Sequence, residues 1–142
     1  MLPFPVSLTP GESPYRQVVY AATKAVVAGL LPAGTPFPSV RELSQALRIN
    51  PNTAHKVVTE LVRNGLLEVL PGVGTVVARS GHASAADRAA LLSTQVEQLV
   101  VEALRLGVDE RTVREALATR WRELSGAAAE DSSPRARRPR AG

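Results

Sequence analysis

The sequence predicts a mainly α-helical fold with a small β-hairpin, in which a helix-turn-helix and the hairpin lie together and a short two-helix annex follows. Residues 39–65 contain two helix-start signals, and a turn of only two residues separates the helices that they begin. The glycine-containing stretch 71–74 then divides two short segments that favour β-strands. Hydrophobic residues make up 44% of the chain, yet Phe, Tyr and Trp contribute only 4%, so aliphatic packing between helices should dominate the core.

The length of 142 residues leaves room for a small domain with a helical annex, but not for a large ligand-binding module. We expect an extended segment at 1–12, a helix-turn-helix domain at 13–79, the annex at 84–125 and a disordered basic tail at 126–142. The tail is low in complexity and carries four arginines. A tail that adds phosphate attraction and a tail without function both fit that composition.

The N-terminal residues are rich in proline, which predicts an extended chain with a short edge strand at 6–8. Ser13 and Pro14 supply an N-cap and a first-turn proline, and Gly29 marks the end of the helix that follows. Apolar residues recur on one side of this helix at three- and four-residue steps. The residues expected to face the core are Tyr15, Val18, Val19, Ala22, Val26 and Val27.

Two start signals define the helix-turn-helix. Ser39 and Glu42 form a capping box, in which the hydroxyl accepts the Glu42 amide and the carboxylate returns to the Ser39 amide. Asn50 is an N-cap, and Pro51 after it needs no amide hydrogen at the first helical position. Only residues 48 and 49 separate the two helices, and this spacing is typical of a helix-turn-helix. The first helix should turn inward Val40, Leu43 and Leu47.

The second helix of the pair has an apolar and a polar side. At about 100° per residue, the apolar side collects Ala54, Val57, Val58, Leu61 and Val62. The polar side collects Asn52, Lys56, Thr59 and Arg63, with Thr53 and His55 on its flanks. Amides, hydroxyls and cations without a central carboxylate suit base edges and phosphates. An ordinary solvated side is the alternative, and the capped helix just upstream favours the nucleic-acid interpretation over it.

A β-hairpin is predicted directly after this helix. Residues 66–70 and 75–78 are two β-prone runs on either side of a turn that contains Gly72 and Gly74. A hairpin beside a helix-turn-helix is a wing, so the predicted fold is a winged helix-turn-helix. The amides of both glycines could contact a phosphate or the minor groove, and a requirement of the turn alone would explain these glycines equally well.

The annex is predicted as two helices. Ser84 with Asp87 starts a helix that Gly107 ends, and Asp109 caps a last helix. A helix pair of this size cannot bury its apolar stripe alone, so it must pack on the winged domain, on a second copy of the chain, or on both. We favour a homodimer. The residues predicted to form its interface are Leu99, Val100, Leu104, Val113, Leu117 and Trp121. A core role within one chain is equally compatible with the spacing of Trp121.

Charge and composition favour a polyanionic partner and argue against an enzyme. The net charge is +4, with seven Lys or Arg against four acids in residues 1–80, and six against seven in residues 81–124. The two histidines, His55 and His82, lie in no metal-ligand or Ser-His-acid spacing, and there is no cysteine, so we expect no metal and no other cofactor. The N-terminus lacks a signal-peptide pattern, and no apolar run is long enough to span a bilayer, which together predict a cytoplasmic protein without membrane contact.

The DNA-binding domain of GntR-type transcription regulators has motifs that are similar, in order and spacing, to Pro38-Ser39-Val40-Arg41-Glu42-Leu43, Asn50-Pro51-Asn52-Thr53, Gly65-Leu66-Leu67-Glu68 and Gly72-Val73-Gly74-Thr75. The similarity runs from about residue 14 to residue 78. The short helical remainder resembles that of the YtrA subfamily. In the wing the sequence departs from the family, which usually places Arg, His or Lys near a tip that here holds Leu70, Pro71 and Val73. We therefore expect little electrostatic help from this wing.

The resemblance implies which side chains contact DNA. Arg41 matches an arginine that reaches DNA from the start of the first helix of the pair, where its fork suits a guanine edge or a phosphate. Asn50, Asn52 and Thr53 match contacts at the N-terminus of the second helix. Lys56 suits a phosphate. His55 stands where other members often carry Arg, and a phosphate contact or a solvated histidine fits that position.

The expected function is that of a transcription regulator, most simply a repressor, which binds an inverted repeat as a homodimer. The YtrA resemblance implies control of neighbouring transporter genes. An unidentified small-molecule effector that binds between the annex and the winged domain is compatible with this function, although no residue set marks its site. The alternative is a winged-helix module that docks proteins without specific DNA binding. The polar centre of the second helix argues against it, because protein interfaces prefer aromatic anchors.

Overall fold

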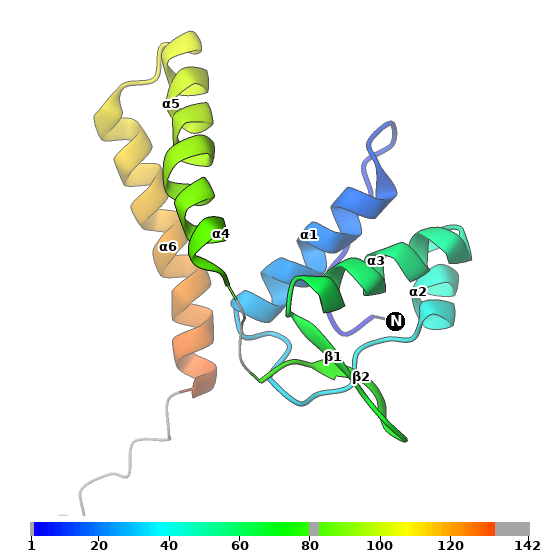
Figure 1. Cartoon of the computed structure of the whole chain (residues 1–142). Coiled ribbons are helices and arrows are strands. Elements are labelled where there is room, and N and C mark those ends of the chain that lie inside the picture. Colours follow the sequence, from blue (N-terminus) through cyan, green and yellow to red (C-terminus); the bar gives the residue numbers. More distant parts are fainter. Residues whose placement is uncertain (1, 80–82, 133–142) are drawn as a thin grey trace, which may run out of the picture.

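The computed structural model describes residues 2–79 and 83–132. Figure 1 shows two parts, a three-helix unit with a β-hairpin and a pair of long helices beside it. The elements are α1 (Pro14–Val27), α2 (Val40–Leu47), α3 (Pro51–Arg63), β1 (Leu67–Leu70), β2 (Gly74–Val77), α4 (Ala85–Ala90), the π-helical segment Leu91–Gln95, α5 (Val96–Arg105) and α6 (Glu110–Ser132). The predicted fold class, mainly α with one hairpin, is confirmed, and the three-helix unit with its wing is the predicted winged helix-turn-helix.

The core lies where α1 and α2 pack against α3. The buried residues are Phe4, Val18, Ala22, Ala25, Ala28, Leu31, Phe37, Leu43, Ala54, Val57, Leu61, Leu67, Val76 and Val77. Val27 was predicted to face this core and is instead exposed. The reason is geometric, because at 100° per residue Val27 lies about 140° around the helix from the buried Ala22. Ala25 is buried in its place.

The predicted edge strand at 6–8 is wrong, because these residues form no strand. The edge of β2 that does not face β1 is already paired with residues 35–37. The amide of Phe37 donates to the carbonyl of Thr75 at 2.9 Å, and the amide of Val77 donates to the carbonyl of Thr35 at 2.9 Å. The N-terminal segment covers the core with side chains instead. Phe4 is buried and stacks on Phe37 with the ring centroids 5.7 Å apart.

Only one of the two hydrogen bonds of the predicted capping box is present at the start of α2. The Ser39 hydroxyl oxygen accepts the Glu42 amide at 3.1 Å. The Glu42 carboxylate accepts the Ser39 hydroxyl at 3.2 Å rather than the Ser39 amide, so the reciprocal half of the predicted capping box is absent. One hydroxyl can serve as acceptor and donor at once, and this keeps the carboxylate away from the backbone.

The turn between α2 and α3 has an unusual backbone. Arg48 ends α2 in the left-handed conformation, with φ 53°, which a non-glycine residue rarely adopts. The Ser44 hydroxyl holds the turn by donating to the carbonyl of Ile49 at 2.8 Å. As predicted, Asn50 caps α3, and its side-chain oxygen accepts the Asn52 amide at 2.8 Å.

The wing (Leu67–Val77) is an antiparallel hairpin that runs from the Leu67–Val77 pair to the Leu70–Gly74 pair. At its tip, the amide of Val73 donates to the carbonyl of Leu70 at 3.0 Å, and Gly72 has φ 76°. Pro71 in the second position and a positive φ in the third are the signature of a type II turn. This turn explains Pro71 and Gly72 by conformation alone.

The annex forms the two predicted helical arms. The Ser84–Asp87 capping box is complete, and α4, the π-helical segment and α5 follow one another without a break. Gly107 has φ 71° where the first arm ends, and Asp109 caps α6 by accepting the Thr112 amide at 2.9 Å. α6 extends to Ser132, beyond residue 126 where the tail was predicted to begin, and the disorder of the tail stays a prediction. The three alanines 127–129 are strong helix formers and outweigh the glycine before them. Residues 133–142, with the four tail arginines, lie outside the described residues.

The annex makes little contact with the winged unit. Among the described helices of the annex, α6 is the one that packs against α1 (Figure 1), and Leu124 lines a groove of about 570 Å³ between α6, α1 and the N-terminal segment. A second groove, of about 730 Å³, runs between α5 and α6 and is lined mainly by Leu and Val side chains. The apolar stripe of the annex is therefore not covered by the winged unit of the same chain.

Candidate nucleic-acid interface

Burial of one side of α3 leaves the opposite side in solvent. Ala54, Val57 and Leu61 are buried against α1 and α2. Consequently three of the predicted site residues on this helix, Asn52, His55 and Lys56, are exposed, and Thr53 is half-buried. The structure thus brings these four predicted residues together on the first two turns of α3.

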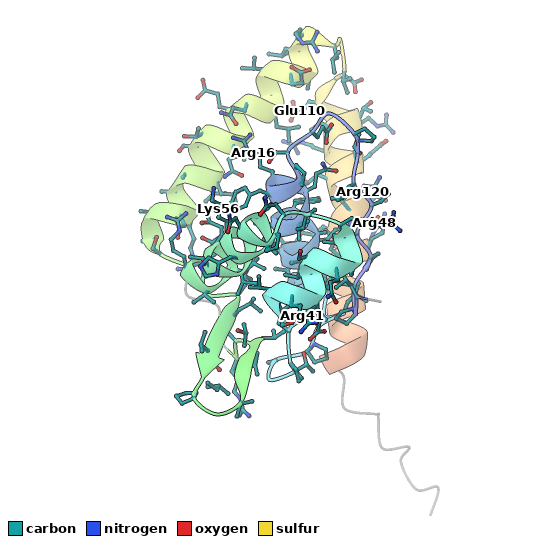
Figure 2. All side chains as sticks on the ribbon, turned by 90° about the vertical axis from the view of Figure 1, so that its right-hand side faces the viewer. Arg16, Arg41, Arg48, Lys56, Glu110 and Arg120 are labelled. Atoms are coloured by element: carbon teal, nitrogen blue, oxygen red, sulfur yellow. The ribbon has the colours of Figure 1, made fainter. Side chains whose placement is uncertain are left out.

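Arg41 lies in the first turn of α2 and is exposed. Figure 2 shows Arg41 at the lower edge of α2 and Lys56 to the left of α3, with the wing below both. Within residues 2–79 and 83–132, no carboxylate lies within 4 Å of either cation. Both side chains therefore keep their charge available for an anion.

Asn50 caps α3, and this limits which of its side-chain atoms can contact DNA. Its side-chain oxygen is already engaged in capping α3, so its amide nitrogen is the group that remains for a phosphate or a base. The helix N-terminus beside it also carries the positive end of the helix dipole, which favours an anion.

Arg48 is a further cation of the helix-turn-helix, and the sequence indicates it only as a turn residue. It is exposed at the C-terminal end of α2, and Figure 2 labels it to the right of α2, whereas Lys56 is labelled to the left of α3. No sequence signal indicates its left-handed backbone, because arginine seldom adopts it. Arg48 lies in the short turn that joins α2 to α3.

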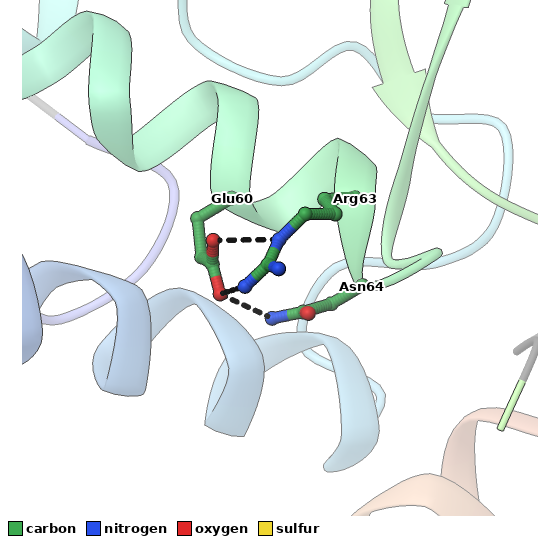
Figure 3. Close-up of polar contacts among 3 residues, drawn as sticks. All are labelled: Glu60, Arg63 and Asn64. Carbon is green, nitrogen blue, oxygen red and sulfur yellow. Dashed lines mark hydrogen bonds and ion pairs between the residues drawn. The ribbon is translucent and has the colours of Figure 1, made fainter. Parts of the chain in front are cut away.

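Arg63 lies on the predicted polar side of α3 but is engaged within the protein (Figure 3). Its Nε donates to the Glu60 carboxylate at 3.0 Å and its Nη2 at 2.6 Å, while the Asn64 side chain donates to the same carboxylate at 3.5 Å. The bond from Arg63 is the main cause that lowers the pKa of Glu60 below its ordinary value, and Asn64 and Tyr15 of α1 add to it. The same pair raises the pKa of Arg63. This arginine is therefore occupied at the far end of α3.

We expect this cluster to contribute a pH-dependent part of stability. A lowered pKa means that the ionised Glu60 stabilises the fold at neutral pH, and that this contribution is lost as pH falls below about 4.3, the ordinary pKa of glutamate. The Glu60→Gln variant should therefore be less stable than the wild type at pH 7, with the difference shrinking towards pH 3. Urea unfolding midpoints across this range measure it. Arg63→Gln is the matched control and should show the same window; a gap that stays constant down to pH 3 would contradict the assignment.

The wing glycines are exposed and conformationally required. Gly72 and Gly74 have φ 76° and 112°, and a Cβ at either position would meet no atom within 4 Å. The backbone conformation, not lack of space, therefore explains both glycines. Their predicted DNA contacts remain predictions.

The predicted interface residues of the annex share one feature, which is that no described part of the chain buries them fully. Leu99, Val100, Leu104 and Leu117 are exposed and line the groove between α5 and α6, together with the half-buried Val113. Trp121 is 70% exposed. A core role for Trp121 within one chain, which the sequence left open, is therefore wrong.

The described residues contain neither a metal-ion site nor a membrane-spanning helix. No group of three or more His, Asp or Glu side chains there is placed to hold a metal ion. None of the helices in that part of the chain combines the length and apolar character that crossing a bilayer would need.

Comparison with known proteins identifies the family. The model of the family described as "Bacterial regulatory proteins, gntR family" matches residues 14–77, which contain α1 to β2. The HTH-type transcriptional repressor YtrA of Bacillus subtilis (strain 168) is 30% identical over 102 residues, which cover 71% of this chain and 78% of that protein. The chain belongs to the GntR family.

Other similar proteins agree with this assignment. The HTH-type transcriptional regulator YhcF of Bacillus subtilis (strain 168) is 31% identical over 90 residues, which cover 63% of this chain and 74% of that one. The crystal structure of a transcriptional antiterminator from Listeria monocytogenes EGD-e matches with a TM-score of 0.70 at 27% identity, over 83% of this chain and 88% of that chain. The protein is thus a YtrA-like GntR regulator, a DNA-binding transcription factor and not an enzyme.

Proposed function

We propose that this GntR-family protein is a repressor that binds an inverted-repeat operator as a homodimer, with α3 of each subunit in the major groove. The observation that carries the proposal is the exposed side of α2 and α3, where Arg41 and Lys56 have no carboxylate partner in the described parts of the chain. Repression is supported by the similar Bacillus subtilis protein, whose name describes it as a repressor.

Each exposed group has a role that its chemistry suits. Asn52 and Thr53 read base edges from the first turn of α3, because amides and hydroxyls can bond to bases in the major groove. Lys56, His55 and the amide nitrogen of Asn50 hold phosphates, which fix the orientation of the helix without reading sequence. The amides of Gly72 and Gly74 approach the DNA backbone from the wing.

Arg41 contacts a guanine edge or a phosphate from α2. Replacing it with alanine should weaken operator binding by about 1 to 3 kcal/mol and leave the fold intact, because the side chain is exposed and lies outside the core. Fluorescence anisotropy with a labelled operator at fixed salt measures the change, and the thermal unfolding midpoint checks the fold. Arg16→Ala removes an exposed arginine of α1 and is the matched control. An unchanged affinity for Arg41→Ala would remove this residue from the interface.

The homodimer rests on the uncovered apolar stripe of the annex. Association of two annexes would hide the side chains that one chain leaves in solvent, and it would hold two copies of α3 roughly 34 Å apart, one turn of DNA. That geometry requires a palindromic operator. Because its target is DNA, we place the protein in the cytoplasm. We place its targets among transporter genes near its own gene, and an effector in the groove between α1 and α6.

The decisive experiment is a footprint on the DNA upstream of the gene that encodes this chain. Two protected half-sites related by inversion, about one helical turn apart, are the expected result. Binding should fall steeply with salt, because cations on the protein release counterions from DNA. Binding that is independent of salt and sequence would instead favour a protein-docking module.

A further inference from the structure

The tip of the wing exposes apolar side chains that the fold does not use. Val69 is 62% exposed, Leu70 38% and Val73 70%. Leu70 pairs across the hairpin with Gly74, which has no side chain to cover it. The type II turn accounts for Pro71 and Gly72 but places no demand on Val73. Folding therefore gives no reason for an apolar tip.

The same hairpin carries no cation. Residues 66–78 contain no Lys or Arg, and their one charged residue is Glu68. The wing therefore lacks the side chains that neutralise phosphates, and it adds nothing to the salt-dependent part of DNA affinity. Whatever the tip contacts must be recognised through shape and apolar surface.

The base of the wing is held firmly while its tip projects. The backbone of residues 34–37 runs along β2, with the amide of Gly34 donating to the carbonyl of Val77 at 2.8 Å and the amide of Phe37 donating to that of Thr75 at 2.9 Å. Leu67 and Val77 at the base are buried. The tip points away from this anchored base, and the wing extends below α2 and α3, which carry Arg41 and Lys56 (Figure 2). It is thus continuous with the DNA-binding surface.

We propose that the wing tip, with Leu70, Pro71 and Val73, enters the minor groove as an apolar wedge and reads the deformability of the DNA beside each half-site. Apolar side chains, leucine and proline among them, are used by minor-groove binding proteins to part base steps and bend the duplex. Pyrimidine–purine steps such as TA and CA open most easily, whereas A-tracts are stiff. The wing therefore favours operators with a flexible step beneath it. This inference rests on the proposed operator binding.

The preference has a direct physical origin. Opening a step costs stacking energy, and that cost is smaller at a flexible step, so the same apolar contact yields tighter binding there. The effect arises at base pairs that α3 does not touch. It also leaves the salt dependence of binding unchanged, because no charge takes part.

The test uses the full-length protein and operator duplexes that differ only in the step beneath the wing, TA in one set and an A-tract in the other. The wild type should bind the TA duplex about tenfold more tightly. The double variant Leu70→Gln with Val73→Thr should lose this preference and keep the wild-type salt slope. Val27→Thr changes an equally exposed valine on α1, away from the wing, and should keep the preference. A 2-aminopurine placed in the TA step should brighten on binding of the wild type but not of the double variant.

The outcomes separate this inference from the proposed function. A wild type that binds the operator with no preference between the two steps, or a double variant that keeps the preference, would overturn the wedge while leaving operator binding intact. Unchanged DNA binding by the double variant, together with lost repression in a transcription reaction with purified RNA polymerase, would assign the tip to a protein partner and also overturn it. Failure of the wild type to bind any duplex would refute operator binding itself.

Discussion

Replacing Leu43 with alanine is expected to leave a large fraction of the winged unit unfolded at 37 °C. Leu43 has no exposed surface and lies in the core where α2 packs on α3. Removing a fully buried leucine side chain costs about 2 to 5 kcal/mol, since both apolar burial and the packing around the cavity are lost. A domain of roughly 65 residues has a free energy of unfolding of only a few kcal/mol, so the substitution removes most of that stability.

Urea unfolding monitored by circular dichroism measures this loss, and operator binding should fall with the folded fraction. Leu30→Ala is the matched control, because Leu30 is exposed and the same atoms are removed without opening a cavity. The control should change stability by only a small fraction of the Leu43 effect. Equal losses in the two variants would show that α2 is not packed as described.

The winged unit could be predicted from the sequence because its signals are local. Asn50 with Pro51 starts α3, and Ser39 starts α2, at the residues where the structure begins them. The apolar period of α3 also identifies its buried side correctly, since Ala54, Val57 and Leu61 are buried. Caps and helical periods depend on neighbours in sequence, so one chain suffices to read them.

The features that were missed depend on contacts between distant segments. The segment 6–8 does not pair because residues 34–37 already occupy the edge of β2, which no local pattern reveals. Arg63 looks free on a helical wheel, but Glu60 and Asn64 hold it within the protein. The left-handed backbone of Arg48 likewise has no sequence signal.

The sequence predicted which residues form the candidate interface, but not which of their polar groups are exposed and free of hydrogen bonds within the protein. The sequence places Asn50 and Asn52 at the start of α3, while the structure shows that the side-chain oxygen of Asn50 already accepts a hydrogen bond from the Asn52 amide. The uncovered state of Trp121 also needed the structure, because its spacing alone fits a core or an interface. Exposure is a property of the whole fold, and a helical period gives only the side on which a residue lies.

Placing aspartate at Leu104 and Leu117 together is expected to convert the protein to a monomer and to weaken inverted-repeat binding by about 10² to 10⁴-fold. Both leucines line the groove between α5 and α6, and Leu104 is 73% exposed. Because neither side chain is buried within one chain, the substitutions should not unfold the subunit. In a dimer they would bury two carboxylates per subunit in a groove whose lining arginine, Arg114, is already paired with Glu110 at 2.6 Å, at a cost of several kcal/mol.

Sedimentation equilibrium measures the assembly, and titrations with one and two half-sites measure the binding. Val101→Asp is the control, because Val101 is exposed on α5 but does not line the groove, and it should keep the dimer. Affinity for a single half-site should be the same in all three proteins, since the winged unit is unaltered. The lower affinity for the full operator then measures only the loss of the connection between the two winged units of the dimer. A wild type that is monomeric at operator-binding concentrations would refute the annex as a dimer interface and would leave its apolar stripe to another partner.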